Sequence, residues 1–113
     1  YDCGFQNNPH IKMPLVLPDS KHARHLYTIW VDPSIRDIAI RKLQEAGIGI
    51  AVNFRAIHLM SYYRNKYNYH GGECPMAEKI GSSTITLPLY PRLKVAEVDY
   101  VVGSVNDILK SCH

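Results

Sequence analysis

The last third of the chain carries the clearest periodic pattern in the sequence. Apolar residues recur there every three or four positions, at Val95, Val98, Val101, Val102, Val105, Ile108 and Leu109. This spacing places them on one face of an α-helix, and such a helix is stable mainly because that face is buried against another element. The rest of the chain must therefore supply a second layer for this helix to cover.

A second helix is predicted between residues 33 and 46. Asp32 can accept a hydrogen bond from a free N–H group of the first turn, and Pro33 has no N–H to leave unpaired. Gly47 can adopt the left-handed conformation that ends a helix. The apolar positions again follow three- and four-residue steps, at Ile35, Ile38, Ala39, Leu43 and Ala46.

Three short strands are predicted, at residues 25–31, 48–53 and 84–87, because these runs are apolar or rich in β-branched and aromatic residues. The second is expected to return beside the first, which makes a β-α-β unit. Two short helices are expected at residues 59–67 and 74–81. The pattern predicts an α+β fold, a small sheet with flanking helices in three layers or fewer, with both long helices on one face.

The N-terminal residues 1–23 are predicted to be an extended linker leading into one domain, residues 24–113. Pro9, Pro14 and Pro18 interrupt helices and central strands in this part of the chain. The chain begins with Tyr1 rather than methionine, so we interpret it as processed or as a piece of a longer protein.

Composition argues against several classes of function. The 13 Lys and Arg residues exceed the 10 Asp and Glu residues by only three, without a basic run, so no nucleic-acid partner is predicted. The tract 62–69 interleaves tyrosines with basic residues, but helical spacing explains those tyrosines as half-buried packing. No membrane-spanning stretch is present, and three widely spaced cysteines favour the reducing cytoplasm.

The sequence alone offers little catalytic chemistry. His70, Glu73 and Cys74 are possible metal ligands, but no second ligand pair accompanies them, so a solvated loop is preferred and no metal is predicted. Gly71 and Gly72 are not surrounded by a phosphate-binding motif, and no G-x-S-x-G motif occurs.

Four segments nevertheless follow one another in an informative order: residues 44–50, residues 53–58 (Asn-Phe-Arg-Ala-Ile-His), Tyr62-Tyr63, and residues 83–91 (Ser-Thr-Ile-Thr-Leu-Pro-Leu-Tyr-Pro). Their order and spacing resemble the DegT/DnrJ/StrS family of pyridoxal-phosphate-dependent sugar aminotransferases. In that family a helix ending in Gly-Ile leads to a strand, an H-[FY]-x-x-x-H segment, a helix with tyrosines and an LPL-x-P turn. The resemblance covers roughly residues 22–110.

The resemblance implies an aspartate-aminotransferase-type fold, of which this chain would be the small C-terminal domain. The N-terminal large domain, which carries the cofactor lysine in this family, would be missing from this chain, and the parent enzyme would be a homodimer. Pyridoxal phosphate is expected in the full-length enzyme and not on this chain. None of the lysines resembles the family's cofactor lysine, namely Lys12, Lys21, Lys42, Lys66, Lys79, Lys94 and Lys110. The isolated chain is therefore expected to be inactive.

The resemblance also implies that Asn53, Phe54, Arg55 and His58 approach the substrate. His58 would bind a sugar hydroxyl or assist proton transfer, or else cap the following helix. Arg55 would hold a carboxylate or phosphate, or else form a surface ion pair. Asn53 replaces the motif's first histidine, and because an amide does not titrate, it supports positioning rather than acid–base chemistry.

The implied activity is transfer of an amino group, with glutamate as the expected donor, to a nucleotide-linked keto sugar. Such sugars serve the biosynthesis of cell-surface polysaccharides, lipid A or antibiotics, and the Phe-Arg-Ala-x-His form is nearest to members that aminate a 4-keto-pentose. Two alternatives stay open: a related sugar 3-dehydratase, and a free-standing binding or interaction module.

Overall fold

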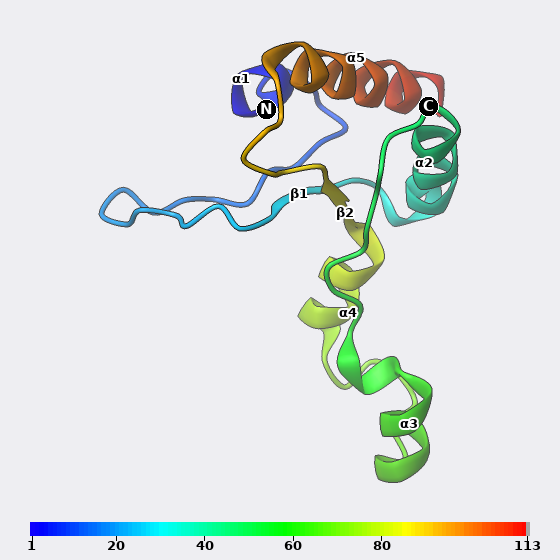
Figure 1. Ribbon diagram of the computed structural model, residues 1–113. Coiled ribbons are helices and arrows are strands. Elements are labelled where there is room, and N and C mark those ends of the chain that lie inside the picture. The colour runs from blue at the N-terminus through cyan, green and yellow to red at the C-terminus, as the bar shows by residue number, and fades with distance from the viewer. Residues whose placement is uncertain (113) are drawn as a thin grey trace.

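The valine-rich helix at the end of the chain is the longest element in the computed structural model, which describes residues 1–112 (Figure 1). The elements follow in the order α1 (Asp2–Phe5), β1 (Tyr27–Trp30), α2 (Pro33–Glu45), the 3₁₀ helix η1 (Ile57–Leu59), α3 (Ser61–Tyr67), α4 (Pro75–Ser83), β2 (Thr84–Leu87) and α5 (Val95–Ser111). None of the helices in the described chain is long and apolar enough to cross a membrane.

Helix α5 buries the middle and the end of its predicted apolar stripe. Val101, Val105 and Leu109 lie in the core, whereas Val95 is 77% exposed. Helix α2 contributes Ile35 and other apolar residues to the same core, so the two long helices stabilise each other as well as the sheet.

Both ends of α2 agree with the sequence. The Asp32 carboxylate accepts hydrogen bonds from the Ser34 N–H at 2.8 Å and from the Ser34 hydroxyl at 2.6 Å. Gly47 has a φ of 77°, a conformation that costs glycine little and other residues more. The local signals therefore set both ends of this helix.

Strands β1 and β2 form an antiparallel pair in which Tyr27 lies opposite Leu87 and Ile29 lies opposite Ile85. Residues directly opposite each other point to the same face of a sheet. These four side chains are buried in one core with those of α2 and α5, and the predicted α+β fold, a small sheet with flanking helices, is confirmed.

The predicted third strand at residues 48–53 is wrong. Ile48 is buried beside the end of α2, and of the segment only Ala51 forms a bridge, with Thr86 of β2. The segment therefore runs along the free edge of β2 rather than beside β1, where Lys12 instead bridges Trp30. The expected β-α-β unit is replaced by an antiparallel arrangement.

The N-terminal segment differs from a simple linker. Residues 2–5 form α1, and Phe5 and Ile11 belong to the core, so the expectation that no helix runs through residues 1–23 is wrong at its start. The prolines begin only at position 9 and leave the first turn free to form. Residues 13–26 do form an extended loop away from the body (Figure 1). The division at residue 24 stays a prediction, and residue 113 lies outside the described residues.

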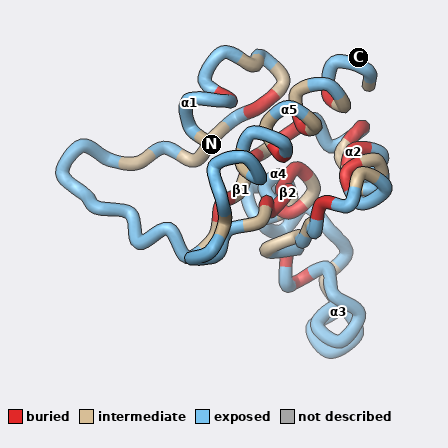
Figure 2. The backbone as a smooth tube through the Cα atoms, turned by 45° about the horizontal axis from the view of Figure 1, so that its top comes forward, coloured by how far each residue is buried: buried red, intermediate tan, exposed pale blue. Residues whose placement is uncertain are grey.

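A second projection is formed by η1, α3 and the start of α4, and Figure 2 shows α3 as a pale, exposed helix. Helix α3 contains no buried residue, and Tyr62 is 63% exposed. The prediction that helical packing half-buries these tyrosines is therefore wrong for Tyr62, Tyr63 and Tyr67, which are all exposed, and only Tyr69 is partly buried. The ring of Tyr62 instead meets that of Tyr63 edge-on, with the centroids 5.2 Å apart.

The hydroxyl of Tyr27 links β1 to α1. It donates a hydrogen bond to Asp2, and its ring lies 4.7 Å from that of Tyr1. Burial, followed by the hydrogen bond and the charge of Asp2, raises the pKa of Tyr27 well above its ordinary value of 10.0. Since the folded state disfavours ionisation, this contribution to stability is present below pH 10.0 and is lost as the pH rises further.

We therefore expect the urea midpoint of the wild type to fall between about pH 9 and about pH 11, where unfolded tyrosines ionise. Tyr27→Phe should be less stable at neutral pH, because Asp2 loses its donor, but its midpoint should fall less over that pH range. Tyr67→Phe, on exposed α3, is the control and should fall like the wild type. If the urea midpoints of Tyr27→Phe and the wild type fell equally with pH, ionisation of Tyr27 would not be coupled to unfolding.

Candidate functional site

Residues 53–58 cross from the edge of β2 to the side of α4. The Ala51–Thr86 bridge fixes the start of this crossing, and the Asn53 N–H donates a hydrogen bond to the Thr86 hydroxyl at 3.3 Å. Farther on, the backbone passes directly over Gly81 of α4, where a Cβ atom would lie 2.8 Å from the Ala56 nitrogen. The backbone of the segment is therefore held at both of these points, while the side chains of Phe54 and Arg55 stay exposed.

The four predicted site residues differ in accessibility. Phe54 is 68% exposed, Arg55 is exposed and Asn53 is half-buried, whereas His58 is only 7% exposed. Within the described chain the Arg55 guanidinium has no hydrogen bond or ion pair, so the alternative of a surface ion pair finds no partner there. Arg55 and Phe54 are both available to a ligand.

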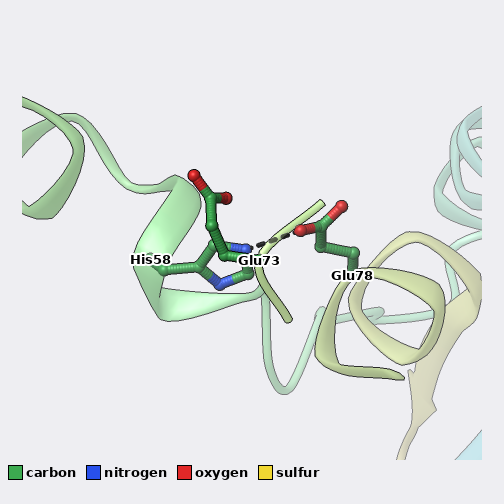
Figure 3. A group of neighbouring side chains, drawn as sticks. All are labelled: His58, Glu73 and Glu78. Carbon is green, nitrogen blue, oxygen red and sulfur yellow. Dashed lines mark hydrogen bonds and ion pairs between the residues drawn. The ribbon is translucent and has the colours of Figure 1, made fainter. Parts of the chain in front are cut away.

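His58 lies in η1 and faces α4. Figure 3 shows its Nε2 atom directed at Glu78, whose Oε1 atom lies 2.7 Å away. A carboxylate can only accept, so Nε2 carries the proton. The ring also packs against that of Tyr69 in a T-shaped arrangement, at a centroid distance of 5.7 Å. As placed, His58 does not cap α3; it pairs with Glu78.

Glu78 also holds the glycine loop that precedes α4. The Gly72 N–H donates to the same Oε1 atom at 2.7 Å, while the N–H groups of His70 and Gly71 donate to the two oxygens of Glu73 at 2.6 and 2.8 Å. Gly71 and Gly72 have φ values of 104° and 91°, which turn these N–H groups toward the carboxylates. The loop's amides are thus taken by the chain's own side chains.

Both carboxylates are stabilised in their ionised form. The hydrogen bond from His58, followed by that from Gly72, lowers the pKa of Glu78 below its ordinary value of 4.5. The backbone N–H of His70 is the main cause of the lowered pKa of Glu73. The network is therefore intact at neutral pH.

A metal ligand set could be drawn from this cluster, because one donor atom each of His58, Glu73 and Glu78 lie within 4.8 Å of one another. The candidates named from the sequence were His70, Glu73 and Cys74, and of these only Glu73 belongs to the group. Both carboxylates already accept N–H groups, so the cluster is complete as a hydrogen-bonded unit. That no metal binds here stays a prediction.

Glu78 was not identified from the sequence. It follows His58 by 20 positions, and no local motif links the two residues. The usable signal was its place in the first turn of a short helix beginning with Pro75, where a carboxylate is favoured. That signal indicates a helix start and gives no indication of the partner.

A pocket of about 490 Å³ lies on another side of α4, lined by Trp30, Asp32, Lys12, Lys79 and neighbouring residues. Its lysines and its carboxylate are two of the groups that a pyridoxal cofactor needs, namely a lysine, a carboxylate for the ring nitrogen and phosphate donors. Both lysines are exposed, and Asp32 already accepts two hydrogen bonds from Ser34. Elsewhere, Lys42 donates to Ser111. The lining of this pocket does not fit a covalent pyridoxal site, and that the chain binds no cofactor stays a prediction.

Two curated proteins resemble this chain over most of its length. Spore coat polysaccharide biosynthesis protein SpsC of Bacillus subtilis is 33% identical over 97% of this chain and 30% of its own length. The UDP-4-amino-4-deoxy-L-arabinose–oxoglutarate aminotransferase of Shewanella sediminis is 34% identical over 85% of this chain and 27% of its own length. The chain thus spans about 30% of the first of these curated relatives and 27% of the second.

Solved structures give the same result. The aminotransferase TlmJ from Streptoalloteichus hindustanus superposes with a TM-score of 0.86 at 28% identity, covering 99% of this chain and 29% of TlmJ. NtdA from Bacillus subtilis, solved with bound cofactor PMP, gives a TM-score of 0.74 at 27% identity, covering 96% of this chain and 25% of NtdA. The sequence model of the DegT/DnrJ/EryC1/StrS aminotransferase family matches residues 1–106, and the chain belongs to that family.

Proposed function

We propose that this chain is the C-terminal domain of a pyridoxal-phosphate-dependent enzyme that transfers an amino group from glutamate to a nucleotide-linked keto sugar. The observation that carries the proposal is the match of residues 1–106 to a family of aminotransferases. The name of the Shewanella relative includes a nucleotide sugar and oxoglutarate. It supports a nucleotide sugar as substrate and glutamate as amino donor, because oxoglutarate is the keto acid that glutamate becomes when it gives up its amino group. The enzyme would be a cytoplasmic homodimer.

The cofactor would be held by residues outside this chain. The two lysines of the pocket beside α4, Lys12 and Lys79, are exposed, whereas the relative NtdA was solved with bound PMP. The chain covers only 25% of NtdA, which leaves the larger part of such an enzyme to supply the cofactor pocket. The isolated chain is accordingly proposed to be inactive.

The exposed apolar side chains agree with a domain that packs against a larger partner. Leu15 and Leu17 lie on the extended loop, and Ile57, Met60 and Met76 lie around η1 and α4, and all of them are exposed. Large apolar side chains gathered on projecting segments are typical of surfaces that another part of a protein covers. The missing large domain and the second subunit would provide that cover.

The complete gene product that contains this chain tests the proposal. It should bind pyridoxal phosphate and convert a UDP-linked 4-keto-pentose into an amino sugar that carries the nitrogen of ¹⁵N-labelled glutamate. Mass spectrometry of the product separates amination from dehydration at C3. A gene product that binds no pyridoxal phosphate, or one that yields only the dehydrated sugar, would contradict the proposed activity.

Within this enzyme we assign substrate contact to Asn53, Phe54, Arg55 and His58. Arg55 supplies a planar, permanently charged group for a phosphate of the nucleotide, and Phe54 supplies an apolar ring beside it. Asn53 can donate and accept hydrogen bonds. His58 is engaged with Glu78 through Nε2, so a contact with the sugar would have to come from the rest of its ring.

Arg55→Ala is expected to raise KM for the nucleotide sugar about 10- to 100-fold, because a hydrogen bond to a charged group contributes roughly 1.5–3 kcal/mol. The effect on kcat should be smaller, since the contact is remote from the reacting carbon. Arg41→Ala, which removes an exposed arginine of α2, is the control and should leave KM unchanged. Steady-state kinetics with the sugar varied at saturating glutamate distinguish the two variants. If Arg55→Ala and Arg41→Ala had equal KM values for the sugar, Arg55 would not contact the substrate.

A further inference from the structure

Two of the side chains proposed to contact the substrate are not held in place by contacts of their own. Phe54 and Arg55 are exposed and make no ring contact, hydrogen bond or ion pair within the described residues. Their position is therefore set by the two ends of the segment that carries them. One end is tied to β2 by the Ala51–Thr86 bridge, and the other end is tied to α4 through His58.

Helix α4 is well suited to hold that second end. It runs directly into β2, and the Thr84 hydroxyl at the junction donates a hydrogen bond to the Ile80 carbonyl at 2.7 Å. Glu78 and Gly81 are three residues apart and so lie on one side of the helix. Glu78 forms a hydrogen bond with His58, and Gly81 leaves room for the backbone at Ala56. The segment 53–58 therefore contacts one face of α4 at two points.

The Glu78 carboxylate is the point where three segments meet. Its Oε1 atom accepts from the His58 ring of η1, as Figure 3 shows, and from the Gly72 N–H of the glycine loop, each at 2.7 Å. His58 is buried and its ring is flanked by Tyr69, so this contact is shielded from water on the histidine side. Charge-assisted hydrogen bonds of this length are directional and hold their partners in a defined geometry.

We propose that Glu78 is a positioning residue of the substrate site: through His58 it sets where Arg55 and Phe54 stand relative to the nucleotide sugar. This inference rests on the proposed function, because it concerns the same site. Glu78 makes no contact with substrate in this assignment. Its role is to connect the substrate segment to the sheet and to the glycine loop at the same time.

The test compares Glu78→Ala with Glu78→Gln in the complete gene product. The glutamine Oε1 atom can still accept from His58 and Gly72, whereas alanine cannot. We expect Glu78→Ala to raise KM for the nucleotide sugar about tenfold, since misplacement of a binding group by about 1 Å can cost up to 100-fold. Glu78→Gln should stay within about twofold of the wild type. Glu45→Ala, at an exposed glutamate of α2, is the control and should have no effect.

A double-mutant cycle separates positioning from a loss of stability. If Glu78 acts through Arg55, the tenfold effect of Glu78→Ala should shrink to less than about twofold in the Arg55→Ala background, because the group being positioned is gone. A general loss of stability would change KM by the same factor in the wild-type and Arg55→Ala backgrounds. Additive effects, or equal effects of Glu78→Ala and Glu78→Gln, would overturn the proposal.

Hydrogen exchange distinguishes failure of this inference from failure of the proposed function. In the complete gene product, peptides that cover residues 53–58 and 70–74 should exchange faster in Glu78→Ala and at the wild-type rate in Glu78→Gln. Unchanged exchange in Glu78→Ala would overturn the connecting role of Glu78 whatever the reaction is. Faster exchange in a protein that does not aminate the sugar would instead overturn the substrate assignment, and with it the proposal as stated.

Discussion

Replacing Phe5 by alanine is expected to lower the free energy of unfolding by about 3–5 kcal/mol, the usual cost of removing a buried phenylalanine. Phe5 is only 1% exposed, and its ring lies 6.0 Å from that of Tyr1 and 6.4 Å from that of Tyr27. It is the residue by which α1 joins the core formed by the sheet and α5. Urea unfolding followed by far-UV circular dichroism measures the change.

The chain contains a matched control, because its only other phenylalanine is Phe54. That ring is 68% exposed, so Phe54→Ala should change the free energy of unfolding by less than about 0.5 kcal/mol. If the two alanine variants were equally stable, α1 would not be docked on α5, and the core would have to begin after the N-terminal segment.

The contrast between these two phenylalanines illustrates what the sequence could and could not predict. Helix α2 was predictable because Asp32, Pro33 and Gly47 act on their immediate neighbours. Strand β2 matches the predicted residues 84–87, since a β-branched run is followed at once by Pro88. Signals of this kind depend on a few adjacent residues and do not require knowledge of the fold.

Phe5 and the segment 48–53 lacked such signals. A single aromatic residue ahead of several prolines gives no periodic pattern, and its burial depends on α5, which lies about 100 positions away in the chain. The apolar run 48–53 resembles a strand, but only Ala51 reaches the ladder, because the start of the run is committed to the end of α2. In both cases tertiary contacts decided the outcome.

The candidate site, like the fold, was predicted from the sequence only in part. The motif at residues 53–58 led to the family and to the exposed pair Phe54 and Arg55. The pairing of His58 with Glu78 was missed, because it requires the chain to turn through α3 and the glycine loop before α4 returns. Neighbouring positions in the sequence drew attention to His70 and Cys74, for which no metal was predicted, whereas the fold brings His58 and Glu78 together in a hydrogen bond.

Gly81→Ala and Gly103→Ala should have opposite effects on stability, although both replace a glycine inside a helix. At Gly103 of α5 an added Cβ meets no atom within 4 Å, so the better helix propensity of alanine should stabilise the chain by roughly 0.5–1 kcal/mol. At Gly81 of α4 the Cβ would lie 2.8 Å from the Ala56 nitrogen and 3.3 Å from two backbone atoms of Arg55. Backbone cannot rotate away as a flexible side chain can.

We therefore expect Gly81→Ala to destabilise the chain by about 1–3 kcal/mol, the usual cost of overpacking, in spite of its gain in helix propensity. The same displacement moves Arg55, so the Gly81 variant of the complete gene product should also lose affinity for the nucleotide sugar, whereas the Gly103 variant should not. Urea unfolding and the KM for the sugar provide the two measurements. A Gly81→Ala protein as stable as Gly103→Ala would show that residues 55 and 56 do not rest on α4, and the positioning role of Glu78 on that same helix face would lose its structural basis.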